Sequence, residues 1–192
     1  ASVVAAFILI ATKQTRPTRR QLMQLSIVAL GVVLGFPVLT AWAMETVPAS
    51  QGGVVLGILP LATAVAAVIV SKEKPSVGFW IFSLIGSIVV VTYSLLQGFG
   101  SFQLGDLLLV GAIISAGLGY ALGGKLSKEL GGWQVICWAL VISFPFIIFP
   151  AWMQAPEEDF SNLPLNVLLS FLYLALVSQL FGFFLWNKGL AL

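Results

Sequence analysis

Few residues in this chain could carry out chemistry. It has no histidine and a single cysteine, Cys137. Histidine is the commonest general base and metal ligand, and a disulfide framework or a cysteine zinc cluster needs more than one cysteine. No pair of carboxylates stands inside an apolar segment. We therefore expect no catalytic centre, no metal site and no cofactor, and we predict that the protein is not an enzyme.

Neutral polar side chains do occur inside the long apolar segments. Gln179 and Ser178 lie near the middle of the last segment, and Ser115 and Tyr120 lie within an earlier, glycine-rich one. An amide in lipid must find a hydrogen-bond partner or line a polar cavity. Gln179 is therefore the strongest candidate for substrate contact, with an interhelical hydrogen bond as the alternative. For the serines, close helix packing is the favoured alternative, and Tyr120 is a candidate to project into a cavity.

Proline interrupts two of the apolar segments. Pro60 lies in the middle of residues 50–71, and Pro37 lies within residues 22–45. A proline removes one helical hydrogen bond and leaves a carbonyl that is stable in lipid only where protein or a water-filled cavity satisfies it. Both segments are therefore predicted to be kinked and to line a cavity.

The composition places these segments in a lipid bilayer. Of the 192 residues, 59% are apolar and 8% are charged. A soluble domain has about 45–50% apolar and about 25% charged residues, so this chain lacks the polar groups to cover a water-facing surface. The excess of Lys and Arg over Asp and Glu, 9 against 7, is too small to suggest nucleic-acid binding.

Seven apolar segments are predicted to be transmembrane helices. A hydrocarbon core of about 30 Å requires about 20 apolar residues in each helix. The run from Ala1 to Ala11 is too short to span, so we interpret it as the end of a helix that begins outside this chain. The six full spans are predicted at residues 22–45, 50–71, 76–97, 106–126, 132–153 and 165–188.

The basic residues predict an orientation. All nine fall at alternate helix ends, hence on one side, and no charged residue falls near the middle of a predicted span. Because short cytoplasmic loops are rich in Lys and Arg, this side is predicted to be cytoplasmic. The basic residues are Lys13, Arg16, Arg19, Arg20, Lys72, Lys74, Lys125, Lys128 and Lys188. Tryptophans near helix ends are expected to anchor the helices in the headgroup zone; they are Trp42, Trp80, Trp133 and Trp152.

The second and seventh predicted helices end in similar sequences. Residues 39–44 read LTAWAM and residues 185–190 read LWNKGL, each with an aromatic residue before a small one and a large apolar one. Since the two helices are five apart along the chain, they cross the membrane in opposite directions. That arrangement is typical of the inverted repeats of secondary transporters. Chance similarity between apolar helices is the alternative.

Three stretches together resemble the EamA-like permeases of the drug/metabolite transporter superfamily. They are Pro48–Ser50 leading through Pro60 to the turn at residues 72–76, the Gly105–Leu108 start of a glycine-rich segment, and the Leu185-Trp186 end of the last span. The central Pro60 followed by the Glu73 turn is the most specific part. The resemblance covers nearly the whole chain.

The resemblance implies ten helices in two inverted halves of five. Residues 1–100 would hold most of the first half and residues 101–192 the first three helices of the second, with one helix before this chain and two after it. The substrate cavity would lie between the halves, lined by the second, third, fifth and seventh predicted helices, and the halves would rock for alternating access. The candidate substrate-binding residues are then Gln179, Tyr120, Trp186, Trp42, Pro60, Ser115 and Ser178.

Such a cavity is apolar, aromatic and without formal charge. It suits small neutral or zwitterionic metabolites such as amino acids, and lipophilic cations held over aromatic rings. The resemblance implies a multi-pass protein of the inner membrane that has the bilayer and a small molecule as partners, with export as the usual direction of transport. A membrane scaffold or sensor that does not transport is the alternative.

Overall fold

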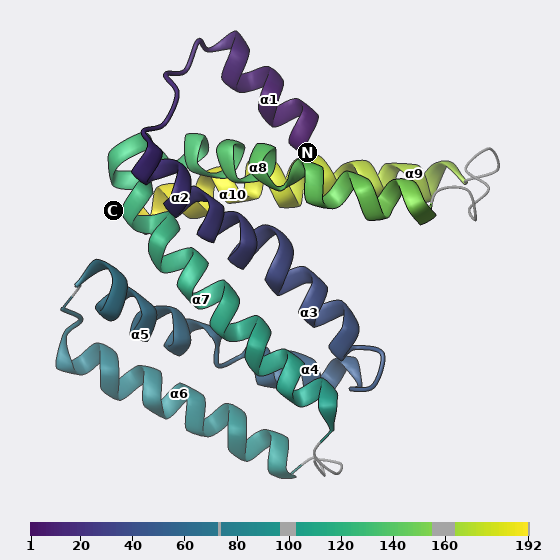
Figure 1. Ribbon diagram of the computed structural model, residues 1–192. Coiled ribbons are helices and arrows are strands. Elements are labelled where there is room, and N and C mark those ends of the chain that lie inside the picture. Colours follow the sequence, from purple (N-terminus) through teal and green to yellow (C-terminus); the bar gives the residue numbers. More distant parts are fainter. Residues whose placement is uncertain (73, 97–102, 155–163, 192) are drawn as a thin grey trace. The chain divides into compact units, whose positions relative to one another are not determined.

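The computed structural model describes residues 1–72, 74–96, 103–154 and 164–191. Every regular element in these ranges is a helix, and no strand occurs in them, which confirms the predicted all-helical fold (Figure 1). The elements are α1 (Ser2–Ala11), α2 (Arg19–Val28), the π-helical η1 (Ala29–Gly35), α3 (Phe36–Ala43), α4 (Ala49–Leu56), α5 (Leu59–Ser71), α6 (Val77–Leu96), α7 (Leu104–Leu130), α8 (Gly132–Gln154), α9 (Leu165–Leu172), the π-helical η4 (Tyr173–Gly182) and α10 (Phe183–Ala191).

Consecutive elements join into helices long enough to cross a membrane. α1 (Ser2–Ala11) and α6, which has an apolar stretch at Val77–Tyr93, correspond to the first and fourth predicted helices. All seven predicted helices are therefore present. The five long and apolar spans in the described chain are Arg19–Ala43, Ala49–Ser71, Leu104–Leu130, Gly132–Met153 and Leu165–Ala191.

Large apolar side chains remain exposed along these helices. Phe82 in α6 is 75% exposed, and Phe149 in α8 is 63% exposed. In water, an exposed apolar surface of this extent would drive association. Lipid tails are as apolar as leucine, so the same surface is stable inside a bilayer. These exposed side chains fit the lipid-facing sides of membrane helices.

The chain divides into two compact units. Unit 1 comprises residues Ala1–Ala29 and Gly123–Leu192, and unit 2 comprises Leu30–Leu122. These units reflect packing contacts, whereas the predicted repeats, residues 1–100 and 101–192, reflect membrane topology. The repeat boundaries therefore stay a prediction.

In unit 1, α8 is the central helix. α1, α2 and α10 all pack against it, and α10 lies alongside α8 (Figure 1). At the start of α8, a Cβ on Gly132 would come within 2.8 Å of the backbone nitrogen of Lys188. The small residue allows the two backbones to approach closely, which is how membrane helices gain van der Waals contact.

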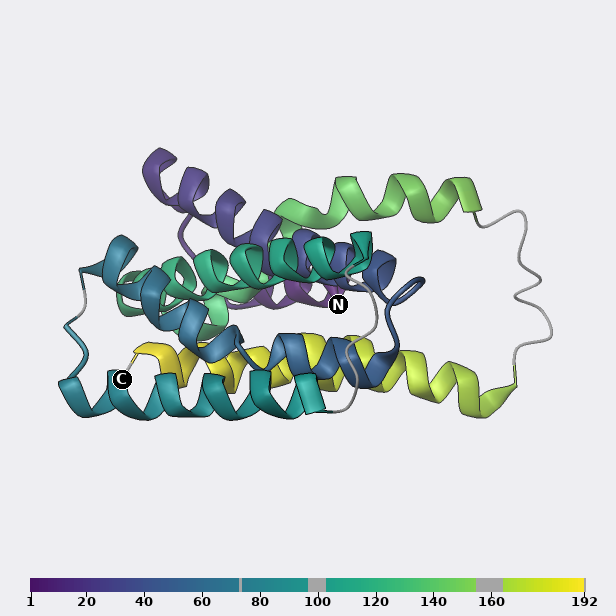
Figure 2. The same ribbon diagram turned by 90° about the horizontal axis from the view of Figure 1, so that it is seen from below.

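In unit 2, α5 and α6 form an antiparallel hairpin (Figures 1 and 2). The span that contains Pro60 is broken, because α4 ends at Leu56 and α5 begins at Leu59. Pro60 occupies the first turn of α5, where backbone N–H groups have no intrahelical partner in any case. The kink predicted near Pro60 is therefore a complete helix break.

Two spans contain a π-helical segment near their middle. η1 stands between α2 and α3 and directly precedes the turn that holds Pro37, while η4 stands between α9 and α10. π-helical turns within α-helices are rare and are frequent at functional sites. The two spans are the ones whose similar ends suggested an inverted repeat, which stays a prediction.

Candidate functional site

The seven candidate site residues are divided between the two units. Three of them belong to the last span of unit 1, and four belong to helices of unit 2. The unit 1 residues are Ser178, Gln179 and Trp186, and the unit 2 residues are Trp42, Pro60, Ser115 and Tyr120.

The last span of unit 1 carries an apolar groove of about 410 Å³. Its lining residues recur three and four positions apart and so share one face of the helix. The two glycines among them leave space beside the indole ring of Trp186. A volume of about 300–1,000 Å³ is typical of small-molecule sites. The lining residues are Gly182, Leu185, Trp186, Gly189 and Leu190.

Gln179 and Ser178 lie in η4, about one turn before this groove. Both side chains are exposed, and the amide side chain of Gln179 makes no hydrogen bond to another described residue. Substrate contact and an interhelical hydrogen bond therefore both stay predictions for Gln179. An unpaired amide in lipid is unfavourable, so its exposed side chain calls for a hydrogen-bond partner.

Ser115 has a role in helix packing. Its hydroxyl donates a hydrogen bond to the carbonyl oxygen of Gly31 in η1, with an O···O distance of 3.2 Å. A Cβ on Gly31 would come within 2.6 Å of the Ser115 carbonyl oxygen and 3.2 Å of the Cα of Gly119. η1 and α7 therefore touch along small residues. This is the packing role considered for the serines, and a substrate contact by Ser115 stays a prediction.

α7 also contacts the helix that begins beside Pro60. A Cβ on Gly117 would lie 3.3 Å from the carbonyl of Ala62 in α5. Tyr120, three residues further along α7, is half-buried. α7 thus brings the Pro60 end of α5 close to the helix face around Gly117. Trp42 does not belong to this group: it lies near the end of α3 and is 57% exposed, as an interfacial anchor would be.

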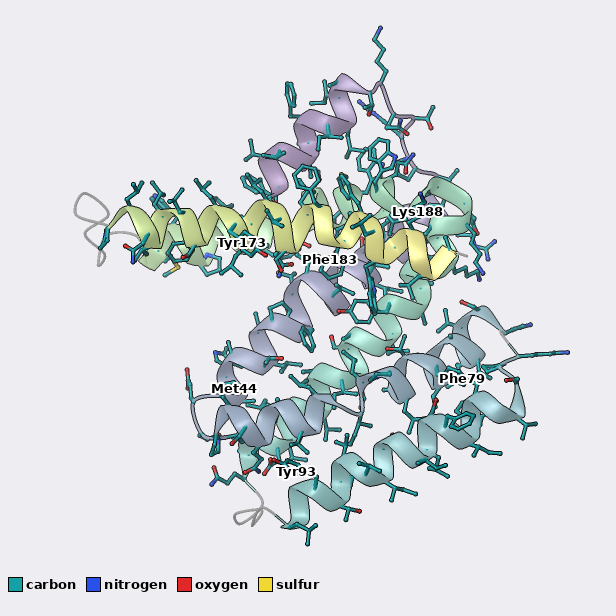
Figure 3. All side chains as sticks on the ribbon, turned by 180° about the vertical axis from the view of Figure 1, so that it is seen from behind. Met44, Phe79, Tyr93, Tyr173, Phe183 and Lys188 are labelled. Atoms are coloured by element: carbon teal, nitrogen blue, oxygen red, sulfur yellow. The ribbon has the colours of Figure 1, made fainter. Side chains whose placement is uncertain are left out.

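Charged side chains of the described spans stand near helix ends. Asp106 lies in the first turn of α7, Lys128 in the last turn of α7, and Lys188 in the last turn of α10. Figure 3 shows Lys188 near the end of the last span, beyond Tyr173 and Phe183. Within the described ranges, no three His, Cys, Asp or Glu side chains gather as metal ligands would. The middle of these spans is neutral.

Asp106 has a partner that the sequence did not suggest. One carboxylate oxygen, Oδ1, accepts a hydrogen bond from Nε2 of Gln51 at 2.9 Å, and Oδ2 accepts one from the backbone N–H of Gln103 at 2.9 Å. An acidic residue in the first turn of a helix is a known local signal, which accounts for the second bond. Gln51 lies 55 positions away in the sequence, so no local pattern could have identified it.

The comparison with known proteins agrees with this architecture. Residues 1–95 and 103–192 match the EamA-like transporter family. The chain belongs to this family. A Bacillus subtilis (strain 168) protein named "Uncharacterized transporter YdeK" is 46% identical over 191 residues, which cover 100% of this chain and 66% of that protein. "Uncharacterized transporter YyaM" from the same organism is 24% identical over 198 residues, covering 99% of this chain and 65% of that protein.

Membership of the EamA-like family confirms the resemblance inferred from the Pro60, Gly105 and Trp186 stretches. The family is one of transporters and not of enzymes, and the chain is a multi-pass membrane protein. It spans about two thirds of the length of the two relatives. No solved structure matches it.

Proposed function

We propose that this EamA-family protein is a secondary transporter that exports small neutral or zwitterionic metabolites, such as amino acids, or lipophilic cations. The neutral middle of the described spans carries the proposal, because a site without fixed charge does not favour strongly ionic substrates. Trp186 offers an aromatic face to a cation, and Gln179 offers an amide to a polar group.

Alternating access would follow from two inverted repeats, residues 1–100 and 101–192. The π-helical segments η1 and η4 in the second and last spans support this part of the proposal. The helix break before Pro60 supports it as well, since discontinuous helices commonly form the binding sites of such transporters.

The basic loops are expected to face the cytoplasm. In a Cys137→Ser background, Arg16→Cys and Lys74→Cys should react with a membrane-impermeant maleimide only in inside-out vesicles. Glu45→Cys, in an acidic loop, should react in intact cells. All three side chains are exposed, so access depends on the membrane face. Labelling of Arg16→Cys and Lys74→Cys from opposite faces would contradict the predicted topology.

The transport proposal is tested with the intact protein in liposomes. We expect flux of radiolabelled leucine or of tetraphenylphosphonium. Gln179→Ala should weaken the apparent affinity for the transported probe several-fold, because one hydrogen bond contributes about 0.5–1.5 kcal/mol. Ser170→Ala is the matched control, since the Ser170 hydroxyl donates to the Asn166 carbonyl of its own helix at 2.8 Å.

A protein that moves neither probe, and in which Gln179→Ala leaves the binding of both unchanged, would reject this proposal. Binding is measured by quenching of tryptophan fluorescence. That outcome would favour the membrane scaffold or sensor.

A further inference from the structure

We propose that Asp106 is a positioning residue for transport. Through Gln51 it holds the short helix α4 against the first turn of α7, and it thereby fixes the helix break at Gly57 and Ile58. The inference rests on the proposed function, because the position of the break matters to transport only if the break belongs to the transport path.

The bond between Asp106 and Gln51 is partly buried. Asp106 is 4% exposed, and its partners among the described residues are two neutral donors, the Gln51 amide and the Gln103 backbone N–H. Each carboxyl oxygen of Asp106 accepts from one of these donors, so both oxygens have a hydrogen-bond partner. A low local dielectric strengthens a buried hydrogen bond and makes the loss of one partner costly.

The α7 side of this contact is firmly packed. A Cβ on Gly105 would come within 2.9 Å of the carbonyl oxygen of Ala43 at the end of α3. Next to it, Ala43, Val47 and Leu109 form a buried apolar cluster. The first turn of α7 is therefore a fixed point to which α4 can be tied.

α4 packs against α6, and Val55 and Leu56 contact the same apolar cluster, while Gln51 adds a tie to α7. α4 has eight residues, and no side chain caps its start. Isolated helices shorter than about 12 residues are marginal, so its placement relies on contacts with its neighbours. At its other end the helix stops at Gly57, whose N–H donates to the carbonyls of Gly53 and Val54. Gln51 lies about 9 Å along the helix axis from Gly57, at about 1.5 Å per residue.

A broken helix at membrane depth is stable only where protein surrounds it or where it lines a water-filled cavity. A shift of α4 would move the turn at Gly57 and Ile58 relative to α5. The carboxylate of Asp106 thus acts on the break indirectly, through the amide of Gln51.

The position of α4 can be measured by electron paramagnetic resonance. Spin labels are attached at Ser50→Cys and Leu107→Cys, two exposed positions beside Gln51 and Asp106, in the intact Cys137→Ser protein in liposomes. We expect strong dipolar broadening between the two spin labels. Asp106→Ala and Gln51→Ala should each reduce this broadening, and the double variant should reduce it no further than either single variant does. Asp106→Asn should retain it, because Asn can accept from the Gln103 N–H and donate to a rotated Gln51 amide.

Gln21→Ala is the matched control. Gln21 donates to a carboxylate oxygen of Glu129 near the other end of α7, but this bond is exposed and 3.3 Å long, so its loss should leave the broadening unchanged. Unchanged broadening in Gln51→Ala, which removes no charge, would overturn the inference even if Asp106→Ala failed to fold. Loss of the broadening in Asp106→Asn would also overturn the inference, because the charge of Asp106, and not its hydrogen bond to Gln51, would then hold α4 in place.

Flux of leucine and tetraphenylphosphonium separates this inference from the proposed function. We expect Gln51→Ala to lower the maximal rate at an unchanged KM when the rate is divided by the amount of monodisperse protein recovered, so that a general loss of folded protein is corrected for. Asp106→Asn should keep the maximal rate of the unsubstituted protein. No flux in the unsubstituted protein would overturn the proposed function. Normal flux in Gln51→Ala would overturn the positioning role alone.

Discussion

Replacement of Gly31 by leucine is expected to abolish most of the folded protein. A Cβ at this position would stand 2.6 Å from the Ser115 carbonyl oxygen and 3.2 Å from the Gly119 Cα. Both are backbone atoms of α7, so they cannot rotate away as a flexible side chain could. η1 would have to move off α7 and break the 3.2 Å bond from the Ser115 hydroxyl to Gly31. Overpacking costs about 1–3 kcal/mol or more.

The measurement is the yield of monodisperse protein in detergent, together with its thermal midpoint. Gly86→Leu is the matched control, because it adds the same side chain in α6, where a Cβ meets nothing within 4 Å. That variant should keep the yield and the midpoint of the unsubstituted protein. Equal yields of Gly31→Leu and Gly86→Leu would show that η1 does not pack closely on α7.

Replacement of Trp186 by alanine is expected to weaken the binding of tetraphenylphosphonium several-fold. The indole ring lines the groove of about 410 Å³ on the last span. Trp186 is 49% exposed. A cation over an exposed tryptophan face gains about 0.5–1 kcal/mol, and about 1.4 kcal/mol corresponds to a tenfold change in affinity. Apparent affinity is measured in the intact protein by concentration-dependent flux in liposomes.

Two variants separate this effect from a loss of membrane anchoring. Trp186→Phe keeps an aromatic face and should retain most of the affinity. Trp152→Ala removes an exposed tryptophan near the end of α8, outside the groove, and should leave the affinity unchanged. An equal loss in Trp152→Ala would attribute the effect to anchoring and contradict a ligand site at Trp186.

The helical membrane fold could be predicted because its cause is local. In lipid, an apolar segment of about 20 residues must satisfy its own backbone hydrogen bonds, and a helix does so within the segment. The last span was predicted at residues 165–188 and is observed at Leu165–Ala191. The three stretches that suggested the EamA-like family were likewise visible in the sequence, and the family match confirms them.

The shape of the individual spans was less predictable. Pro60 suggested a kink, but the chain forms two separate helices with a turn at Gly57 and Ile58. A proline removes one donor, and how the backbone responds depends on which neighbours satisfy it. The π-helical segments η1 and η4 carried no signal that was recognised in the sequence.

Polar partners were decided by the tertiary structure. Ser115 and Gln179 gave similar signals, as neutral polar residues at membrane depth. Yet Ser115 bonds to Gly31, 84 positions away, whereas the Gln179 side chain is exposed in η4. Asp106 looked like an ordinary acidic residue at a helix start until the fold placed Gln51 beside it. Hydropathy is a property of adjacent residues and selects the segments that enter lipid. Hydrogen-bond partners are distant in sequence, so only the packing of the helices selects them.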